Sequence, residues 1–241
     1  MKEQIRKNFD LSPAAYDEYA ARTGRFADLA ERLFGKIRDH QSGPLDRILD
    51  AGAGSGESTR VIEQYDCDVV ALDISQEMLR RNETPNRVQA DFDSLPFDSE
   101  SFDSIAFTAS LFLTPDPESA VSQASRVVRT GGTVGAVTPL GWSTVDGSDV
   151  FDSVERRSRS PAATDEVETA LRSSFDVSTG TWTFETTGRN LRLFHAVPAM
   201  AARLYPRLEP EARVEKAGEL LADVDGPLFQ EWRWYVGTLP A

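Results

Sequence analysis

A strand-like run, Ile48-Leu49-Asp50-Ala51, leads directly into a turn that contains Gly52, Gly54 and Gly56. Glycine permits tight turns and leaves the main chain bare, so a ligand can approach the backbone to van der Waals distance. Residues 57–65 follow with a helical pattern, so the turn joins a strand to a helix. This arrangement predicts a ligand site at the glycine turn, and a tight turn without a ligand is the alternative.

Two aspartates stand at the ends of the next two predicted strands. Asp73 follows Val69-Val70-Ala71-Leu72, and Asp91 ends the run that begins at residue 87. The carboxyl ends of parallel strands meet at one edge of a sheet, where ligands bind. A carboxylate at Asp73 can accept both hydroxyls of an adenosine ribose, and one at Asp91 can accept from the adenine amino group. Each aspartate alone also suits a turn or a helix cap, and Asp73 precedes a helix that it would cap.

The spacing of the glycines argues against a cofactor that carries phosphates. Nicotinamide-binding turns follow the pattern G-x-G-x-x-G, but the position of the third glycine is Glu57, and the glycine comes one place early, at Gly56. An acidic residue at the start of the helix would repel a pyrophosphate. The pattern G-x-x-x-x-G-K-[ST] is also absent. An adenosine ligand without phosphates fits best, and a nicotinamide oxidoreductase is a weaker alternative.

These motifs together resemble those of a known family. The run from Asp50 to Gly56 resembles motif I of class I S-adenosylmethionine-dependent methyltransferases. The segment Asp91-Phe92-Asp93-Ser94-Leu95-Pro96-Phe97, followed by Ser101-Phe102-Asp103, is similar to a run in their small-molecule, type 11 subgroup, which includes quinone-ring and malonyl-carrier methyltransferases. The stretch from Phe9 to Ala20 resembles their leading cap, and Arg129 to Gly132 resembles their turn into the fifth strand.

The resemblance implies that the cofactor is S-adenosyl-L-methionine. Nine residues would hold it, from the methionine end through the ribose to the adenine: Asp50, Gly52, Gly54, Thr108, Asp73, Ile74, Asp91, Phe92 and Tyr16. The first four of these would meet the methionine moiety, and Asp73 with Ile74 would hold the ribose and one face of the adenine. Asp91 and Phe92 would frame the adenine, while Tyr16 would close over the cofactor from the cap. A packing tyrosine is the alternative for Tyr16.

The same resemblance implies an enzyme that transfers a methyl group to an oxygen or carbon of a small-molecule acceptor. Positioning and desolvation can promote such an in-line displacement, and no catalytic residue is assigned. The signature [DN]-P-P-[YF] of N-methyltransferases is absent, and Phe112 stands where relatives often carry a histidine. His195 would reach the site only if its segment folds over the pocket, and a core or surface histidine is the alternative.

A different class of function stays open beside the enzyme. A regulatory or non-catalytic protein that binds adenosylmethionine would need the same fold and the same cofactor residues. Production of adenosylhomocysteine in the presence of an acceptor separates the two classes.

Alternating strands and helices must position these residues. Strands are predicted at 47–51, 69–73, 87–91, 103–107 and 133–138, with helices at 57–65, 76–82 and 118–129 between them. Alternation at this spacing predicts an α/β fold with a parallel sheet and right-handed crossovers. Later strands at 175–185 and 232–238 complete the seven-stranded, mostly parallel Rossmann-like sheet that the resemblance implies.

Three regions make up the expected organisation. Residues 1–42 form an N-terminal helical cap, in which Ser12 caps the helix that starts at Pro13. Residues 43–185 and 229–241 form the methyltransferase core. Residues 186–228 form a helical insertion that would be a substrate lid, with a cationic rim from Arg189, Arg192 and Arg203, or else a packing layer.

Composition limits the partners. The 241 residues carry a formal charge of −13, which disfavours nucleic acid even with Arg156, Arg157 and Arg159 close together. A single cysteine and two histidines exclude an internal disulfide and disfavour a metal site of the Cys/His type. No run approaches the ~20 apolar residues of a membrane span, and the first residues lack the apolar run of a signal peptide, so a cytoplasmic location is expected.

The acidic surface also suggests an environment. Only four of the 26 basic residues are lysine, and acidic residues number 39. Such a surface is typical of halophilic proteins, because concentrated salt screens the repulsion between like charges. An ordinary acidic protein from a GC-rich genome is the alternative.

Overall fold

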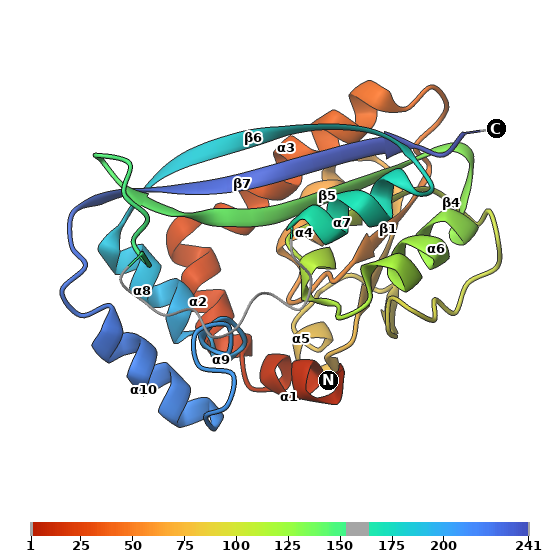
Figure 1. Cartoon of the computed structure of the whole chain (residues 1–241). Coiled ribbons are helices and arrows are strands. Elements are labelled where there is room, and N and C mark those ends of the chain that lie inside the picture. Colours follow the sequence, from red (N-terminus) through yellow and green to blue (C-terminus); the bar gives the residue numbers. More distant parts are fainter. Residues whose placement is uncertain (1, 153–163, 241) are drawn as a thin grey trace.

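The computed structural model describes residues 2–152 and 164–240, and the cluster of Arg156, Arg157 and Arg159 lies outside these ranges. Its centre is one seven-stranded sheet in the order β3-β2-β1-β4-β5-β7-β6 (Figure 1). The strands are β1 (Arg47–Ala51), β2 (Asp68–Asp73), β3 (Arg87–Gln89), β4 (Phe102–Phe107), β5 (Val128–Thr144), β6 (Asp176–Thr187) and β7 (Pro227–Thr238). Strands β1 to β5 run parallel to one another, and β7 is antiparallel to both β5 and β6. The predicted Rossmann-like fold class is confirmed.

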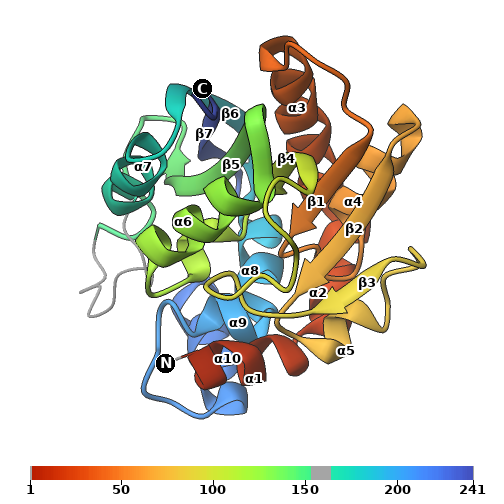
Figure 2. The ribbon, with the colours of Figure 1, turned by 90° about the vertical axis from the view of Figure 1, so that its right-hand side faces the viewer.

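Helices cover both faces of this sheet. Figure 2 shows α6 (Pro117–Val127) and α7 (Thr164–Arg172) on one side, and α3 (Arg25–His40) and α4 (Glu57–Ile62) on the other. The N-terminal region contains two further helices, α1 (Lys2–Asp10) and α2 (Pro13–Thr23), and α5 (Gln76–Leu79) follows β2. Short 3-10 turns at Glu63–Tyr65 and Leu111–Leu113 complete the connections of the core.

Helix α3 belongs to the layer that covers the sheet. Its apolar face, including Leu33 and Ile37, is fully buried. A Cβ atom added at Gly135 of β5 would lie 2.7 Å from Ile37 Cδ1, so the glycine allows the helix to approach the strand closely. The expected cap of residues 1–42 therefore divides into α3, which packs on the sheet, and α1 with α2, which lie beyond it.

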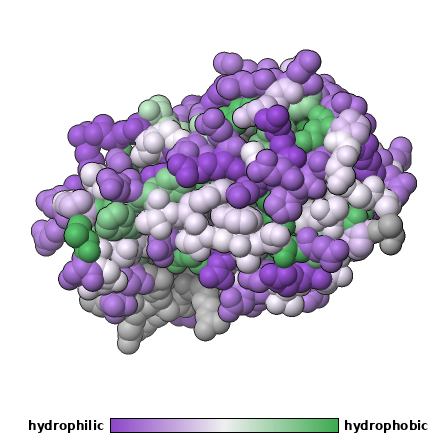
Figure 3. Space-filling view, turned by 90° about the horizontal axis from the view of Figure 1, so that it is seen from above, coloured by the Kyte–Doolittle hydropathy of each residue, from purple (hydrophilic) through white to green (hydrophobic). Residues whose placement is uncertain are grey.

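The three last strands form a long ribbon. Strand β5 extends far beyond the predicted end at Thr138, and its second half pairs with the first half of β7. The register shifts between Pro139 and Gly141, so an irregularity accommodates these two residues within the strand. Seen from above, this face of the molecule is mainly hydrophilic with small apolar groups (Figure 3).

The segment between β6 and β7 folds into three helices, as expected. They are α8 (Gly188–Ala196), α9 (Pro198–Ala201) and α10 (Pro210–Leu220), which lie near α1 and α2 (Figure 1). No helix within the described residues combines the length and apolarity needed to cross a bilayer.

Two helix starts differ in how they are capped. The Asp116 side chain accepts from the Ser119 N–H and so caps α6. The Ser12 side chain does not cap α2, although the helix starts at Pro13. Its hydroxyl instead donates to Asn8 O and accepts from the Ala199 N–H at 3.2 Å, because it is buried between α1 and α9.

Candidate functional site

The glycine turn after β1 has a backbone that only glycine adopts easily. Gly52, Gly54 and Gly56 have φ angles of 80°, 52° and 99°. The N–H groups of Gly52 and Ala53 both donate to Leu72 O, at 2.7 and 3.0 Å, which ties the turn to β2. The turn therefore presents bare, oriented main chain at the carboxyl end of β1.

Close packing also requires glycine here. A Cβ atom at Gly52 would lie 2.3 Å from Ser110 Cβ and 3.2 Å from Phe92 Cζ. A Cβ atom at Gly54 would lie 3.1 Å from Met78 Cε and 4.0 Å from the Tyr16 hydroxyl. Side chains from four other segments thus converge on the turn.

Asp73 joins the end of β2 to this turn. Its Oδ2 accepts from the Gly54 N–H at 2.9 Å and its Oδ1 from the Ser75 N–H at 2.8 Å. The Ser75 hydroxyl, not Asp73, accepts from the Met78 N–H and caps α5, so the capping alternative for Asp73 is wrong. Burial raises the pKa of Asp73 to about 6, although the backbone N–H groups of Ser75 and Gly54 lower it.

Asp50 has a different place from the predicted one. It is fully buried, and its Oδ2 accepts from the hydroxyls of Ser58 and Thr59 at 2.7 Å each. Burial raises the pKa of Asp50 to about 6, while the two hydroxyls lower it. Asp50 is not among the residues that line the pocket, so the expectation that it lines the methionine end is corrected. It lies beneath the glycine turn and holds the start of α4.

A single pocket brings the other predicted residues together at the carboxyl edge of the sheet. Eight of the nine line it: Tyr16, Gly52, Gly54, Asp73, Ile74, Asp91, Phe92 and Thr108. The empty space in and in front of the pocket, open solvent included, is about 720 Å³. Residues that were not among the nine predicted to hold the cofactor complete the lining: Lys2, Ile5, Phe9, Phe26, Met78, Ala109, Ser110, Leu113, Thr114, Pro115 and Met200.

Helix α1 supplies a wall that sequence reasoning missed. Ile5 and Phe9 line the pocket one helical turn apart, and this i, i+4 spacing was the available signal. Lys2 Nζ lies 3.1 Å from Asp91 Oδ2 and also contacts Asp93. The predicted adenine partner Asp91 is therefore an ion-pair partner of α1.

Tyr16 of α2 and Thr108, which follows β4, both line the pocket. The Tyr16 ring stacks on Phe26, with ring centroids 4.6 Å apart, so its packing role and its place at the pocket coexist. Burial raises the pKa of Tyr16 well above its usual value, so its hydroxyl stays neutral. The Thr108 Oγ1 atom is buried without a hydrogen-bond partner among the described residues and can bind a ligand.

The C-terminal helices contribute less to the pocket than expected. Of the described residues of α8, α9 and α10, Met200 of α9 is the one that lines the pocket. His195 is buried, lies against Phe151 and Phe194 and does not line the pocket, in agreement with the core alternative.

The expected cationic rim is also absent from the described lining. Arg192 donates to Leu221 O and Val224 O, and Arg203 lies 5.2 Å from the ring centroid of Phe112. These contacts direct the guanidinium groups of Arg192 and Arg203 away from the pocket, and neither residue lines it. Arg189 does not line the pocket either.

The pocket fits an adenosine ligand without phosphates. A carboxylate that two N–H groups orient suits a pair of ribose hydroxyls, and Phe92 and Ile74 suit the faces of a base. Two carboxylates in the lining, Asp73 and Asp91, disfavour a pyrophosphate. The bare turn and the free Thr108 hydroxyl suit the amino-acid end of such a ligand.

Comparison with known proteins agrees with this geometry. Residues 49–135 match a family described as methyltransferase domain. A sarcosine/dimethylglycine N-methyltransferase from Halorhodospira halochloris is 36% identical over 119 residues, which are 44% of this chain and 43% of that protein. A malonyl-[acyl-carrier protein] O-methyltransferase from Halorhodospira halophila is 34% identical over 140 residues, 54% of this chain and 46% of the other. The chain thus spans under half the length of these relatives.

Solved structures share the fold at low identity. A phosphoethanolamine N-methyltransferase from Haemonchus contortus, in complex with S-adenosyl-L-methionine, has a TM-score of 0.55 at 16% identity, covering 89% of this chain and 53% of that one. The [4+2]-cyclase SpnF has a TM-score of 0.56 at 17% identity, covering 88% and 82%. The matches confirm the predicted resemblance to class I methyltransferases, together with S-adenosylmethionine as the cofactor of that family.

Proposed function

We propose that this chain, whose residues 49–135 match the methyltransferase domain family, is an S-adenosylmethionine-dependent methyltransferase. It transfers a methyl group to an oxygen or carbon of a small-molecule acceptor. One observation carries the proposal: Asp73, with each carboxylate oxygen already held by one backbone N–H, lines the same pocket as the bare glycine turn. This combination suits recognition of a ribose next to an amino-acid chain.

Different residues of the pocket would bind different parts of the cofactor. Asp73 accepts the ribose hydroxyls, Asp91 accepts from the adenine amino group, and Phe92 packs against the ring. The glycine turn and Thr108 receive the methionine end. When bound, the cofactor supplies a methyl group on a positively charged sulfur. The protein's own contribution is to align the acceptor with that methyl group and to exclude water.

The remaining walls indicate the character of the acceptor. Phe9, Phe26, Leu113, Pro115 and Met200 form an apolar surface beside the predicted cofactor residues. Within the described lining the one lysine, Lys2, is already paired with two aspartates. An acceptor with a large apolar part and its own nucleophilic oxygen or carbon fits this chamber best.

A non-catalytic or regulatory adenosylmethionine-binding protein is the second candidate. SpnF, a [4+2]-cyclase, shares the fold, so the fold alone does not prove methyl transfer. The described lining also contains no histidine or cysteine that would serve as a base. The two candidates share the cofactor pocket and differ in turnover.

Ligand binding and turnover test the proposal in two steps. We expect adenosylhomocysteine to raise the melting temperature, because a ligand selective for the folded state stabilises it, and NADH to leave it unchanged. Incubation with adenosylmethionine and a set of phenols, quinols and carboxylic acids should then yield adenosylhomocysteine. A shift with NADH alone would refute the cofactor, and binding without turnover across the set would favour the second candidate.

A further inference from the structure

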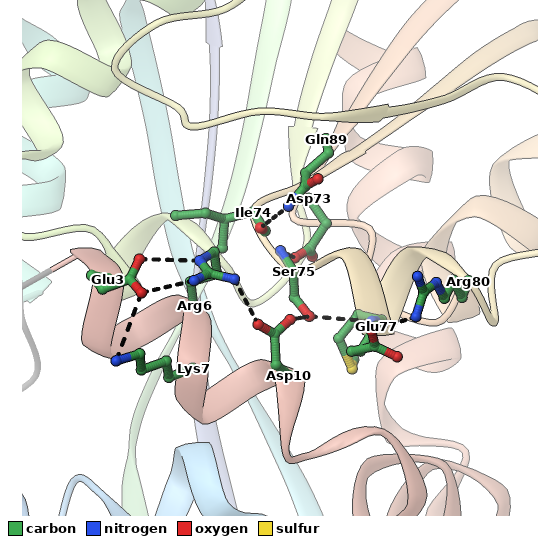
Figure 4. A network of polar contacts seen from close by, with 11 residues as sticks. Glu3, Arg6, Lys7, Asp10, Asp73, Ile74, Ser75, Glu77, Arg80 and Gln89 are labelled. Atoms are coloured by element: carbon green, nitrogen blue, oxygen red, sulfur yellow. Dashed lines mark hydrogen bonds and ion pairs between the residues drawn. The ribbon is translucent and has the colours of Figure 1, made fainter.

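Helix α1 contacts the loop after β2 as well as the pocket. Its residues Ile5 and Phe9 line the pocket. At its C-terminal end, Asp10 Oδ1 accepts a hydrogen bond from the Ser75 hydroxyl at 2.7 Å (Figure 4). The two residues are 65 positions apart in the sequence, so this bond fixes α1 against the loop through tertiary structure alone.

Ser75 connects Asp10 to the predicted ribose carboxylate. Its hydroxyl donates to Asp10 and accepts from the Met78 N–H at 3.2 Å, and its own N–H donates to Asp73 Oδ1 at 2.8 Å. A hydroxyl has a single proton, so donation to Asp10 leaves its lone pairs for Met78. Ser75 is fully buried, and without Asp10 its proton would lack an acceptor. The side chain would then turn and disturb the start of α5.

The orientation of Asp73 depends on the same loop. Its Oδ2 accepts from the Gly54 N–H of the glycine turn, and its Oδ1 accepts from the Ser75 N–H of the loop after β2. Any movement of Ser75 therefore turns the carboxylate or breaks one of its two bonds. A ribose that binds two oxygens of one carboxylate is sensitive to such a rotation, because both bonds require the same plane.

We infer that Asp10 is a positioning residue for the Asp73 carboxylate and acts on it through Ser75. The inference rests on the proposed function, since it requires that Asp73 binds the ribose of the cofactor. The chain also contains a matched control. Arg6 Nη1 lies 3.0 Å from the other oxygen of Asp10, Oδ2, so Arg6→Ala removes an ion pair of Asp10 and leaves its bond to Ser75 (Figure 4).

A double-mutant cycle on the full chain tests the inference, with binding of adenosylhomocysteine measured by calorimetry. We expect Asp10→Ala to weaken binding about three- to tenfold in the wild-type background and less than about twofold when Asp73 is already alanine. Arg6→Ala should change the affinity by less than about twofold. This pattern would show that Asp10 acts through Asp73.

Other results would overturn the inference. Equal losses of affinity in both backgrounds would mean that α1 acts only as a wall of the pocket. No loss of affinity in either background would mean that the hydrogen bond between Asp10 and Ser75 does not affect binding. If Asp10→Ala does not fold, Ser75→Ala, which removes the other end of the same bond, enters the cycle with the same expectation. Failure of the wild type to bind adenosylhomocysteine would instead refute the proposed function, so the two failures are distinguishable.

Discussion

The pocket edge of β1, β2 and β4 and the ribbon of β5, β7 and β6 are parts of one sheet, but different forces hold them. At the pocket edge, glycines at positive φ surround two buried carboxylates, Asp50 and Asp73. In the ribbon, cationic side chains of α3 pack on aromatic rings. Arg25 lies 3.8 Å from the ring centroid of Phe184, and Lys36 lies 4.9 Å from that of Trp234.

The difference separates function from stability. Burial raises the pKa of both Asp50 and Asp73 to about 6, so holding them ionised at neutral pH lowers the stability of the folded state. The cation–π contacts of the ribbon contribute stability, and the residues that make them do not line the pocket. Substitutions at the pocket edge should therefore change binding, and substitutions in the ribbon should change stability.

The largest effect is expected at Gly54. Gly54→Val places a branched side chain at positive φ, 3.1 Å from Met78 Cε, and fills the pocket edge. Binding of adenosylhomocysteine should weaken at least about 1000-fold, roughly 4 kcal/mol. Gly131→Val is the control, since Gly131 also has positive φ but has open space around its Cβ position and lies outside the pocket. Undiminished affinity of Gly54→Val in calorimetry would exclude the turn as the site.

The ribbon should respond in the opposite way. Phe184 is 6% exposed and has Arg25 and Arg32 over its ring. Phe184→Ala should lower the free energy of unfolding by about 3–4 kcal/mol in urea titration, through lost packing. The affinity for adenosylhomocysteine should stay within about twofold. A more than fivefold change in affinity would contradict the division between the two regions, and Phe184→Leu should cost less than about 1.5 kcal/mol.

Asp73 provides the next test on the pocket side. Asp73→Ala would remove the two proposed charge-assisted bonds to the ribose, and water would replace them in part, so we expect a loss of roughly 2–3 kcal/mol, or about 30- to 150-fold in affinity. Asp73→Asn should fall between, because its amide oxygen still accepts one bond. Calorimetric titration of the three proteins measures the series. Affinity of Asp73→Ala within about twofold of wild type would remove the ribose role.

The pocket edge was predictable because its signals are local. The turn from Ile48 to Glu57 combines a strand, glycines and a helix start in ten consecutive residues, and strand-end aspartates follow from the same short-range pattern. Asp50 was misplaced because the sequence does not show which strand-end carboxylate points toward the ligand. Its hydroxyl partners Ser58 and Thr59 offered the missing signal, since they follow it in the first turn of α4.

The ribbon and the α1 wall were less predictable, because long-range contacts determine them. Pro139 and Gly141 indicate the end of a strand, but pairing with β7 continues past them through a register shift. Arg213 of α10 is buried and donates to Asn8 of α1 at 2.8 Å, and the sequence contains no signal for this pair. Tertiary structure therefore decides which surface helices complete the pocket.

The smallest expected effect concerns pH and the two buried carboxylates of the pocket edge. Burial raises the pKa of Asp73 to about 6, so the carboxylate proposed to accept the ribose hydroxyls is lost as the pH falls through 6. The affinity for adenosylhomocysteine should fall roughly tenfold between pH 7.5 and pH 5, since a protonated group loses up to tenfold per unit below its pKa. Calorimetry across this range measures the trend, and a flat profile would contradict the role of ionised Asp73.

Stability of the ligand-free protein should follow the opposite trend. The folded-state pKa values of Asp50 and Asp73 lie above their unfolded values, so the folded state binds more protons between pH 4 and pH 6. The stability from these two groups is therefore greatest below about pH 4 and is lost as the pH rises through 6. Asp50→Asn should weaken this trend in urea titrations and leave the fall in affinity at low pH in place, because Asp50 lies outside the pocket lining. The midpoint of that fall should move to lower pH, since the charges of Asp50 and Asp73 repel each other. Loss of the binding trend in Asp50→Asn would assign the titration to Asp50 and place it in the site after all.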